Sequence, residues 1–277
     1  RLSFFFNCHN DFFEEIAKFR AARTLWHDLM VKRYAPKNPK STMLRFHTQV
    51  AGVSLTAQQP MNNVARVTIQ ALAAVLGGTQ SLHTNSYDEA LGLPTESSAT
   101  VALRTQQIIA EESGVADAVD PMAGSWHVER MTNEIYERAS ELVAIIEEKG
   151  GAMAAIEEGW QQQEIHLSAY AYLNEIEQNK RNIVGVNYGV MDELESIPVL
   201  KTDASLGESQ TSRLAQLRKD RDQQSVDVAL AAIREAAASQ TNLFEPVIQA
   251  VRCRATLGEI MGELKQEFGT YMAPSGF

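Results

Sequence analysis

Cysteine is scarce in this chain, which has only Cys8 and Cys253 among its 277 residues. Two cysteines so far apart, with no partner motif, exclude a disulfide framework, and we expect each to be a small buried side chain in a reducing, cytoplasmic setting. The six histidines include no HExxH pair and join no Cys/His cluster. We therefore expect no metal site built from this chain's own residues.

Positive charge and long apolar runs are scarce as well. The 25 Lys and Arg residues are outnumbered by 35 Asp and Glu residues, which gives a formal net charge of -10. Nucleic-acid binding needs a clustered basic face, so we expect no nucleic-acid partner. No apolar run approaches the roughly 18 residues of a membrane span, and no signal peptide opens the chain. With 44% hydrophobic residues, the chain can still bury a core of one large domain or two average ones.

Strand and helix patterns alternate through the first half of the chain. The strand patterns cover 4–6, 44–49 and 81–85, and the helix-period patterns cover 12–30, 64–76 and 99–112. This order predicts an α/β fold with parallel strands. In closed parallel barrels the loops that follow the strands carry the chemistry.

The second half reads as helices with breaks. Helix patterns cover 132–148, a short stretch after Gly150-Gly151, 161–178, 211–239 and 242–268, with a brief β-like piece at 184–187 and an extended linker at 191–210. We divide the chain into strand–helix units at 1–127, a helical extension at 128–190, and a linker with terminal helices at 191–277. The chain does not begin with Met and opens on a strand pattern, so we expect it to be the later part of a longer or split protein.

The segment 77–95, GGTQSLHTNSYDEALGLPT, is unusually rich in hydrogen-bonding side chains. Buried polar groups need partners, and a loop this rich in them usually meets a ligand. His83 lies in this segment and His47 in the preceding strand pattern, each near a strand's carboxyl end. Both could contact a ligand or be satisfied core histidines, whereas His27 and His166 read as helix-surface residues.

Three further features each allow a functional interpretation and a purely structural one. Gly77-Gly78 lacks the phosphate-loop pattern and is best read as a helix C-cap. Glu89 could bind sugar hydroxyls, or it could be a first-turn carboxylate that favours a helix dipole, while the adjacent Asp88 points elsewhere. Arg1 beside Ser3 could bind a phosphate or carboxylate, or be a surface arginine at a strand end.

These residues resemble the methylmalonyl-CoA mutase family of adenosylcobalamin-dependent acyl-CoA mutases. The most specific string is GTQSLHTN at 78–85 followed by DEAL at 88–91. Further matches are RLSFF at 1–5, IAKFRA at 16–21, NNVAR at 62–66, EESG at 111–114, DP at 120–121 and VGVN at 184–187. The resemblance spans nearly the whole chain.

The resemblance implies the C-terminal part of a TIM (β/α)8 barrel followed by a helical extension and a linker. CoA would thread the barrel axis, and adenosylcobalamin would sit on the carboxyl face. By position, Arg1 and Ser3 match acyl-CoA contacts. Matches to cofactor contacts are Gln49, Gly52, Glu89 and Gly92, while His47 and Gln80 match polar residues that line the cavity near the cofactor.

Three departures bear on the substrate. The family's Phe-Trp-Gly is Phe5-Phe6-Asn7 here, its Gly-Trp is Gly52-Val53, and its Asp-Pro-Trp-Gly-Gly-Ser is DPMAGS at 120–125. The first departure resembles the isobutyryl-CoA and separate-subunit branches. The expected reaction is (R)-methylmalonyl-CoA to succinyl-CoA, with isobutyryl-CoA or 2-hydroxyisobutyryl-CoA mutase as the alternative.

The resemblance also implies what this chain does not supply. The family's catalytic cavity residues would lie upstream of Arg1, and no histidine has the Asp-x-His-x-x-Gly context of the lower cobalt ligand. The implied partners are an N-terminal barrel half and a cobalamin-binding subunit or domain, in an oligomer. The implied reaction is a radical carbon-skeleton rearrangement, in which the cofactor does the hard chemistry and the protein orients the groups and excludes water. The alternative from another class is a non-catalytic barrel fragment with a structural role.

Overall fold

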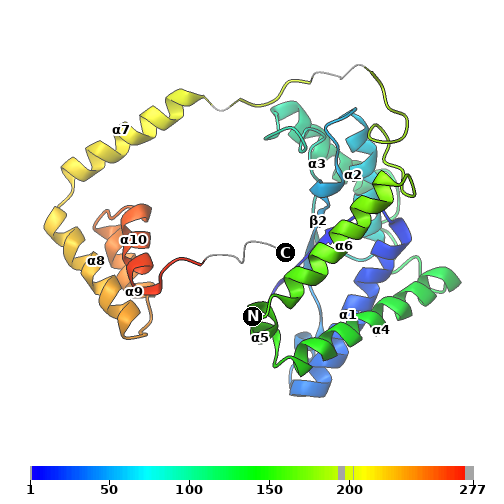
Figure 1. Cartoon of the computed structure of the whole chain (residues 1–277), viewed down its shortest axis with the longest axis horizontal. Helices are drawn as coiled ribbons and strands as arrows, with labels where there is room; N and C mark the ends of the chain where they lie inside the picture. The colour runs from blue at the N-terminus through cyan, green and yellow to red at the C-terminus, as the bar shows by residue number, and fades with distance from the viewer. Residues whose placement is uncertain (1, 193–196, 202, 272–277) are drawn as a thin grey trace. The chain divides into compact units, whose positions relative to one another are not determined.

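The computed structural model describes residues 2–192, 197–201 and 203–271. The chain forms two compact units, Arg1–Leu200 and Lys201–Phe277, which are described separately (Figure 1). Among the described residues, no helix has the length and apolar character that crossing a membrane requires.

A parallel three-stranded sheet organises the first unit. Its strands β1 (Phe4–Cys8), β2 (Phe46–Val50) and β3 (Ser81–His83) pair in the order β1-β2-β3. The three predicted strands are confirmed, although the third ends at His83 and not at residue 85. The sheet does not close into a barrel within the described residues, so the barrel stays a prediction.

Side chains alternate between the two faces of this sheet, because successive residues of a strand point to opposite sides. One face is covered by α1 (Phe12–Tyr34), α2 (Asn62–Leu76) and α3 (Glu96–Glu111). There Phe46 stacks on Phe19 of α1 with ring centroids 5.1 Å apart, and Phe6 meets Phe46 edge-on. The opposite face carries Phe5, which is 64% exposed, and a set of polar side chains.

Both cysteines are free thiols, and Cys8 is fully buried on the helix side of β1. Its thiol donates to the carbonyl of Gln70 at 3.1 Å. Burial, with Glu15 nearby, raises the pKa of the Cys8 thiol, so it stays protonated and inert. The prediction of a buried small side chain is confirmed for Cys8, while Cys253 is half-buried.

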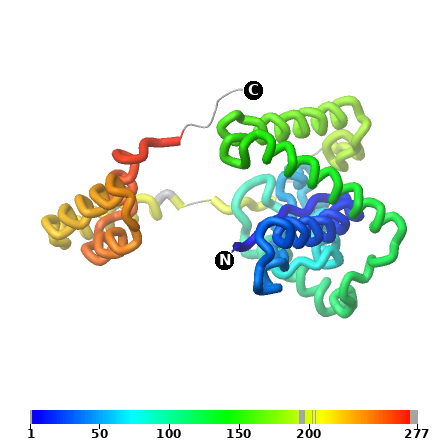
Figure 2. Tube along the Cα trace, turned by 90° about the horizontal axis from the view of Figure 1, so that it is seen from below, coloured from blue at the N-terminus to red at the C-terminus, as the bar shows by residue number. Residues whose placement is uncertain are grey.

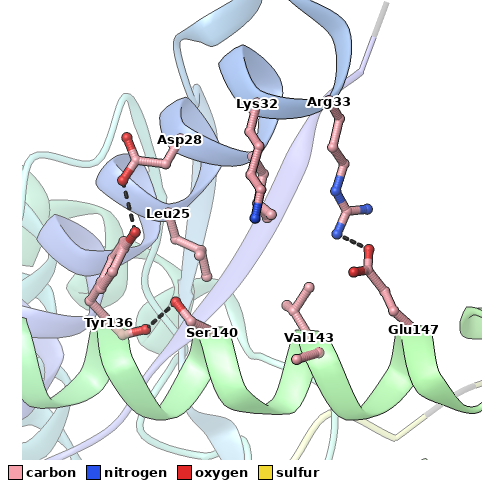
Figure 3. A pocket seen from close by; sticks show the side chains of 10 residues that line it. Leu25, Asp28, Lys32, Arg33, Tyr136, Ser140, Val143 and Glu147 are labelled. Carbon is pink, nitrogen blue, oxygen red and sulfur yellow. Dashed lines mark hydrogen bonds and ion pairs between the residues drawn. The ribbon is translucent and has the colours of Figure 1, made fainter.

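Helix α4 (Trp126–Glu148) packs along α1, and it begins earlier than the predicted residue 132. Its first turn has a single fully buried apolar residue, Val128, which is too few to mark a helix by its apolar pattern. A polar contact adds to the packing there, because Arg20 of α1 pairs with Glu129 at 2.9 Å. Further along, Tyr136 Oη donates to Asp28 at 2.8 Å, and Arg33 pairs with Glu147 (Figure 3). A groove of about 570 Å³ lies between these two contacts.

Among the described residues, the rest of the first unit consists of two 3-10 turns, one short helix, one longer helix and irregular segments. They are the 3-10 turns η1 (Pro39–Thr42) and η2 (Gly52–Ser54) and the helices α5 (Ala152–Glu157) and α6 (Trp160–Glu177). The predicted β-like piece at 184–187 is a tight turn with a single bridge between Val184 and Tyr188, and it joins no sheet.

The second unit contains four described helices, not the predicted two (Figure 2). They are α7 (Ala204–Asp220), α8 (Gln223–Ala238), α9 (Phe244–Arg252) and α10 (Leu257–Phe268). Asp222 caps α8 by accepting from Gln224 N, and so breaks the predicted 211–239 helix. Helix α7, capped by Asp203, begins inside the predicted linker, of which residues 193–196 and 202 lie outside the described residues.

A largely buried ion pair links the α7–α8 junction to the start of α10 in this unit. Arg221, between α7 and α8, donates to both carboxylate oxygens of Glu259 at 2.6 and 2.7 Å. Glu259 also completes a capping box with Thr256 at the start of α10. The hydrogen bond from Arg221 is the main reason that the pKa of Glu259 falls to about 2 from its ordinary 4.5.

We predict that Glu259→Gln destabilises the second unit at neutral pH by about 1.5–3 kcal/mol, because it leaves the Arg221 guanidinium with a neutral partner. The pKa of Glu259 is lowered in the folded state, so its contribution is present above pH 4.5 and is lost as the pH falls towards 2. Urea unfolding of residues 201–277 at pH 7 and pH 3 measures this. The control Glu263→Gln, which breaks the more exposed pair with Arg234, should cost at most about 1 kcal/mol. Equal effects of both variants would contradict the prediction.

Candidate functional site

The loops after β2 and β3 bring four polar or small residues together at the carboxyl edge of the sheet. Gln49 lies near the end of β2, and Gly52 begins the turn that follows it. Gln49 Nε2 donates to Asn85 Oδ1 at 3.2 Å, which joins the two loops. Glu89 lies beside Gly52, since a Cβ added to Gly52 would be 3.6 Å from Glu89 Oε1.

Asn85 is the buried member of this group, with 2% of its surface exposed. Besides accepting from Gln49, it donates from Nδ2 to the carbonyl of Val50 at 3.1 Å. A Cβ on Gly52 would approach Asn85 Nδ2 to 2.8 Å, which is too close for any other residue type without a shift. Gly52 is therefore required by the packing of Asn85.

Glu89 is exposed, and its carboxylate has no hydrogen-bond or ion-pair partner among the described residues. Its neighbour Asp88 points into the protein and is fully buried, so the two carboxylates diverge as predicted. Burial alone would raise the pKa of Asp88, but hydrogen bonds from Ser98, Ser86 and Thr95 outweigh it and lower the pKa. Helix α3 begins at Glu96, so the helix-dipole interpretation of Glu89 is wrong.

Gly92 lies on the same loop, but the structure gives it a packing contact. A Cβ at Gly92 would come within 2.8 Å of Val199 Cγ1, so the chain at Val199 passes directly over this glycine. A cofactor contact at Gly92 remains a prediction.

A row of side chains crosses the open face of the sheet from β1 to β3. Phe5, His47 and Ser81 stand in register on the three strands. The ring of His47 lies 4.8 Å from the ring of Phe5, and its Nδ1 bonds Ser81 Oγ. In the next row towards the carboxyl edge, Asn7, Gln49 and His83 stand in register.

The amino edge of the sheet has a different character. Ser3 is exposed just before β1, and Arg1 lies outside the described residues. A pocket of about 730 Å³ opens here, and its lining includes the aromatic residues Phe4 and Trp26 and the cations Lys40 and Arg45. No acidic residue lines this pocket, and neither cation is paired among the described residues.

Gln80 belongs to this amino edge. Its Oε1 accepts from Phe46 N at 2.7 Å, and its Nε2 donates to the carbonyl of Gly78 at 2.7 Å. Both halves of the amide are thus occupied by backbone at the start of β2. The predicted cofactor cavity requires Gln80 to lie close to Gln49 and Glu89. The structure does not bring these three residues together.

A second cavity, of about 860 Å³, adjoins the carboxyl edge. His9, Val53 and Ser54 line it from the strand-end loops, and α4 and α6 supply a largely apolar wall that includes Trp160 and Tyr172. Gln161 on this wall has a buried Oε1 without a hydrogen-bond partner. The described residues contain no group of three or more potential metal ligands.

Sequence reasoning missed three residues of this site. Asn85 ends the GTQSLHTN string, but only the fold shows that it bonds Gln49 across two strands. Lys40 and Arg45 were not singled out, although the place of Lys40 before the second strand pattern and of Arg45 at its start was a usable signal. Gly77 ends α2, and Gly78 has a φ of +81°, which confirms the C-cap interpretation.

The comparison with known proteins agrees with the family resemblance that the sequence motifs indicated. The family model described as methylmalonyl-CoA mutase matches residues 1–270. The chain belongs to the methylmalonyl-CoA mutase family. It is 46% identical to the probable mitochondrial methylmalonyl-CoA mutase of Caenorhabditis elegans, over 99% of this chain and 37% of that protein.

Two further relatives are informative. The methylmalonyl-CoA mutase of Escherichia coli K12 is 46% identical over 99% of this chain and 38% of its own length. The 2-hydroxyisobutanoyl-CoA mutase large subunit of Aquincola tertiaricarbonis is 44% identical over 98% of this chain and 49% of its own length. The chain thus spans between a third and a half of the length of these relatives.

We predict that Gly52→Ala loosens the carboxyl edge, because its Cβ would displace Asn85 and break two hydrogen bonds. Amide exchange in peptides covering 46–56 and 81–95 should become faster by about tenfold, equivalent to about 1.4 kcal/mol. The control Gly207→Ala adds a methyl group in α7 where no atom lies within 4 Å. It should leave these peptides unchanged, and unchanged exchange in Gly52→Ala would refute the packing argument.

Proposed function

We propose that this chain forms part of an adenosylcobalamin-dependent mutase that isomerises the carbon skeleton of a short acyl-CoA. The observation that carries the proposal is the division of polar groups between the two edges of one sheet. Gln49, Gly52 and Glu89 gather at the carboxyl edge, and the cations Lys40 and Arg45 gather at the amino edge. The open face between them carries Phe5 and His47.

The carboxyl edge suits the adenosyl group and the corrin ring. An unpartnered carboxylate at Glu89 can accept from two ribose hydroxyls, and the absence of a side chain at Gly52 leaves room for a ligand beside it. The adjoining cavity of about 860 Å³ offers a large apolar wall, to which Trp160 and Tyr172 contribute. When bound, the cofactor supplies the radical chemistry that a carbon-skeleton rearrangement needs.

The amino edge suits the nucleotide end of CoA. Lys40 and Arg45 are free to bind phosphates, and Trp26 offers an aromatic surface on the same pocket. Ser3 lies at this edge and is assigned to the same end. Arg1 is assigned there by the family motif alone.

The residues of this chain would bind and orient, not transfer protons. His47, whose Nδ1 bonds Ser81, would hold a polar group on the open face, and Phe5 beside it would exclude water. The proposed substrate is (R)-methylmalonyl-CoA, with succinyl-CoA as the product. The 44% identity to a 2-hydroxyisobutanoyl-CoA mutase large subunit makes 2-hydroxyisobutanoyl-CoA the second candidate.

The partners follow from this assignment. A TIM barrel needs five further strands beyond the three described here, and the proposed mutase obtains them from an N-terminal barrel half. The lower cobalt ligand would come from a cobalamin-binding domain or subunit. A complete enzyme with no turnover of either acyl-CoA in the presence of adenosylcobalamin would reject the proposed activity.

We predict that Glu89→Gln in the complete enzyme weakens adenosylcobalamin binding by about tenfold or more, because a charged acceptor for the ribose is lost. Equilibrium titration of the cofactor measures this, with Glu96→Gln on the first turn of α3 as the matched control. An affinity as high as that of the unmodified enzyme would remove Glu89 from the site.

We also predict that Arg45→Met raises the KM for every acyl-CoA by a similar factor and leaves kcat nearly unchanged, because the contact is to the shared CoA carrier. Steady-state kinetics with two acyl-CoA substrates test this. The control is Arg104→Met, a change of an exposed arginine on α3. An effect confined to one acyl group would assign Arg45 to the reacting end instead.

A further inference from the structure

Asn63, in the first turn of α2, is a fully buried polar residue whose side chain uses all four of its hydrogen-bonding positions. Its Oδ1 accepts from Thr56 N at 3.1 Å and from Arg66 at 2.7 Å. Its Nδ2 donates to the carbonyls of Thr56 and Tyr87, at 2.9 Å each. A buried amide so fully satisfied fixes the position of every group that it bonds.

The groups that Asn63 joins belong to the two loops at the carboxyl edge of the sheet, where the cofactor is proposed to bind. Thr56 follows the turn that begins at Gly52, and Tyr87 lies two residues before Glu89. Asn63 is therefore a direct bridge between the loop that carries Gly52 and the loop that carries Glu89. The same two loops approach each other closely where Glu89 Oε1 lies 3.6 Å from a Cβ placed on Gly52.

The same bridge reaches a third segment. Arg66, which donates to Asn63 Oδ1, also donates to the carbonyl of Val184 at 2.7 Å. Gln59 Nε2 donates to the carbonyl of Gly189 at 2.9 Å. The turn at 183–189 is thus fastened to the loop after β2 through neighbours of Asn63.

We propose that Asn63 is a positioning residue that sets the distance between Glu89 and Gly52, and so tunes the affinity of the carboxyl edge for adenosylcobalamin. The inference rests on the proposed function, and Asn63 itself contacts neither ligand. Only an amide of this size can donate to two carbonyls and accept from two donors at once. A carboxylate at this position would repel the carbonyls of Thr56 and Tyr87 while it kept the contact with Arg66.

Asn63→Asp in the complete enzyme, compared with Asn62→Asp, tests the proposal. Asn62 is the adjacent residue and is exposed, and its side chain donates to Gln59 Oε1 at 2.9 Å. Both variants add a negative charge to the same helix N-terminus, so their effects on the helix dipole cancel in the comparison. Asn63→Ser is a second variant that removes the bridge without adding charge.

The expected result is a loss confined to the cofactor end. Titration with adenosylcobalamin should give a dissociation constant raised about tenfold or more for Asn63→Asp and Asn63→Ser, and by less than about twofold for Asn62→Asp. The dissociation constant of CoA, bound at the amino edge, should stay within about twofold for all three. Equal weakening of both ligands, or no weakening of either by the Asn63 variants, would overturn the proposal.

A double-mutant cycle with Glu89→Gln separates positioning from general stability. If Asn63 acts through Glu89, Asn63→Asp should add less than about twofold once Glu89 is replaced. A fully additive effect would overturn the proposal. Failure of the unmodified enzyme to bind adenosylcobalamin would instead reject the proposed function, so the two failures can be told apart.

Discussion

The parallel pairing of β1, β2 and β3 is the constraint on which the rest of the first unit depends. Parallel strands place all their carboxyl ends at one edge and all their amino ends at the other. Residues scattered over the chain from Ser3 to Glu89 are thereby sorted into two chemically different ends. The period of two along each strand then decides whether a side chain meets the helices, as Phe46 does, or the open face, as His47 does.

Buried polar side chains keep the strand-end loops in place. Asn63, Asn85 and Asp88 are almost completely inaccessible to solvent, and each bonds backbone groups of the loops. Loops at a ligand site cannot rely on an apolar core, because the surface that they present must remain open. Amide and carboxylate side chains beneath the surface supply the rigidity instead, and they leave Glu89 and Gly52 free to face a ligand.

Membership of the methylmalonyl-CoA mutase family connects this geometry with acyl-CoA mutases. The relatives are named for two different acyl-CoA compounds, methylmalonyl-CoA and 2-hydroxyisobutanoyl-CoA. The chain is about equally similar to a relative of each name, at 46% and 44% identity. In the proposed function the acyl group would lie on the open face, so Phe5 and His47 would be the residues of this chain nearest to it.

The sequence by itself determined the strand–helix alternation of the first half and the family, because both rest on local patterns and on the specific string at 78–85. It also determined the diverging directions of Asp88 and Glu89. The tertiary structure decided the rest. It placed Gln80 at the amino edge, where backbone groups of Phe46 and Gly78 occupy its amide. It paired Arg221, beside the break that Asp222 makes in the predicted 211–239 helix, with Glu259, which is far away in the sequence. It also brought Asn63 against Tyr87. These outcomes depend on hydrogen bonds between distant residues, which no local period of hydrophobicity records.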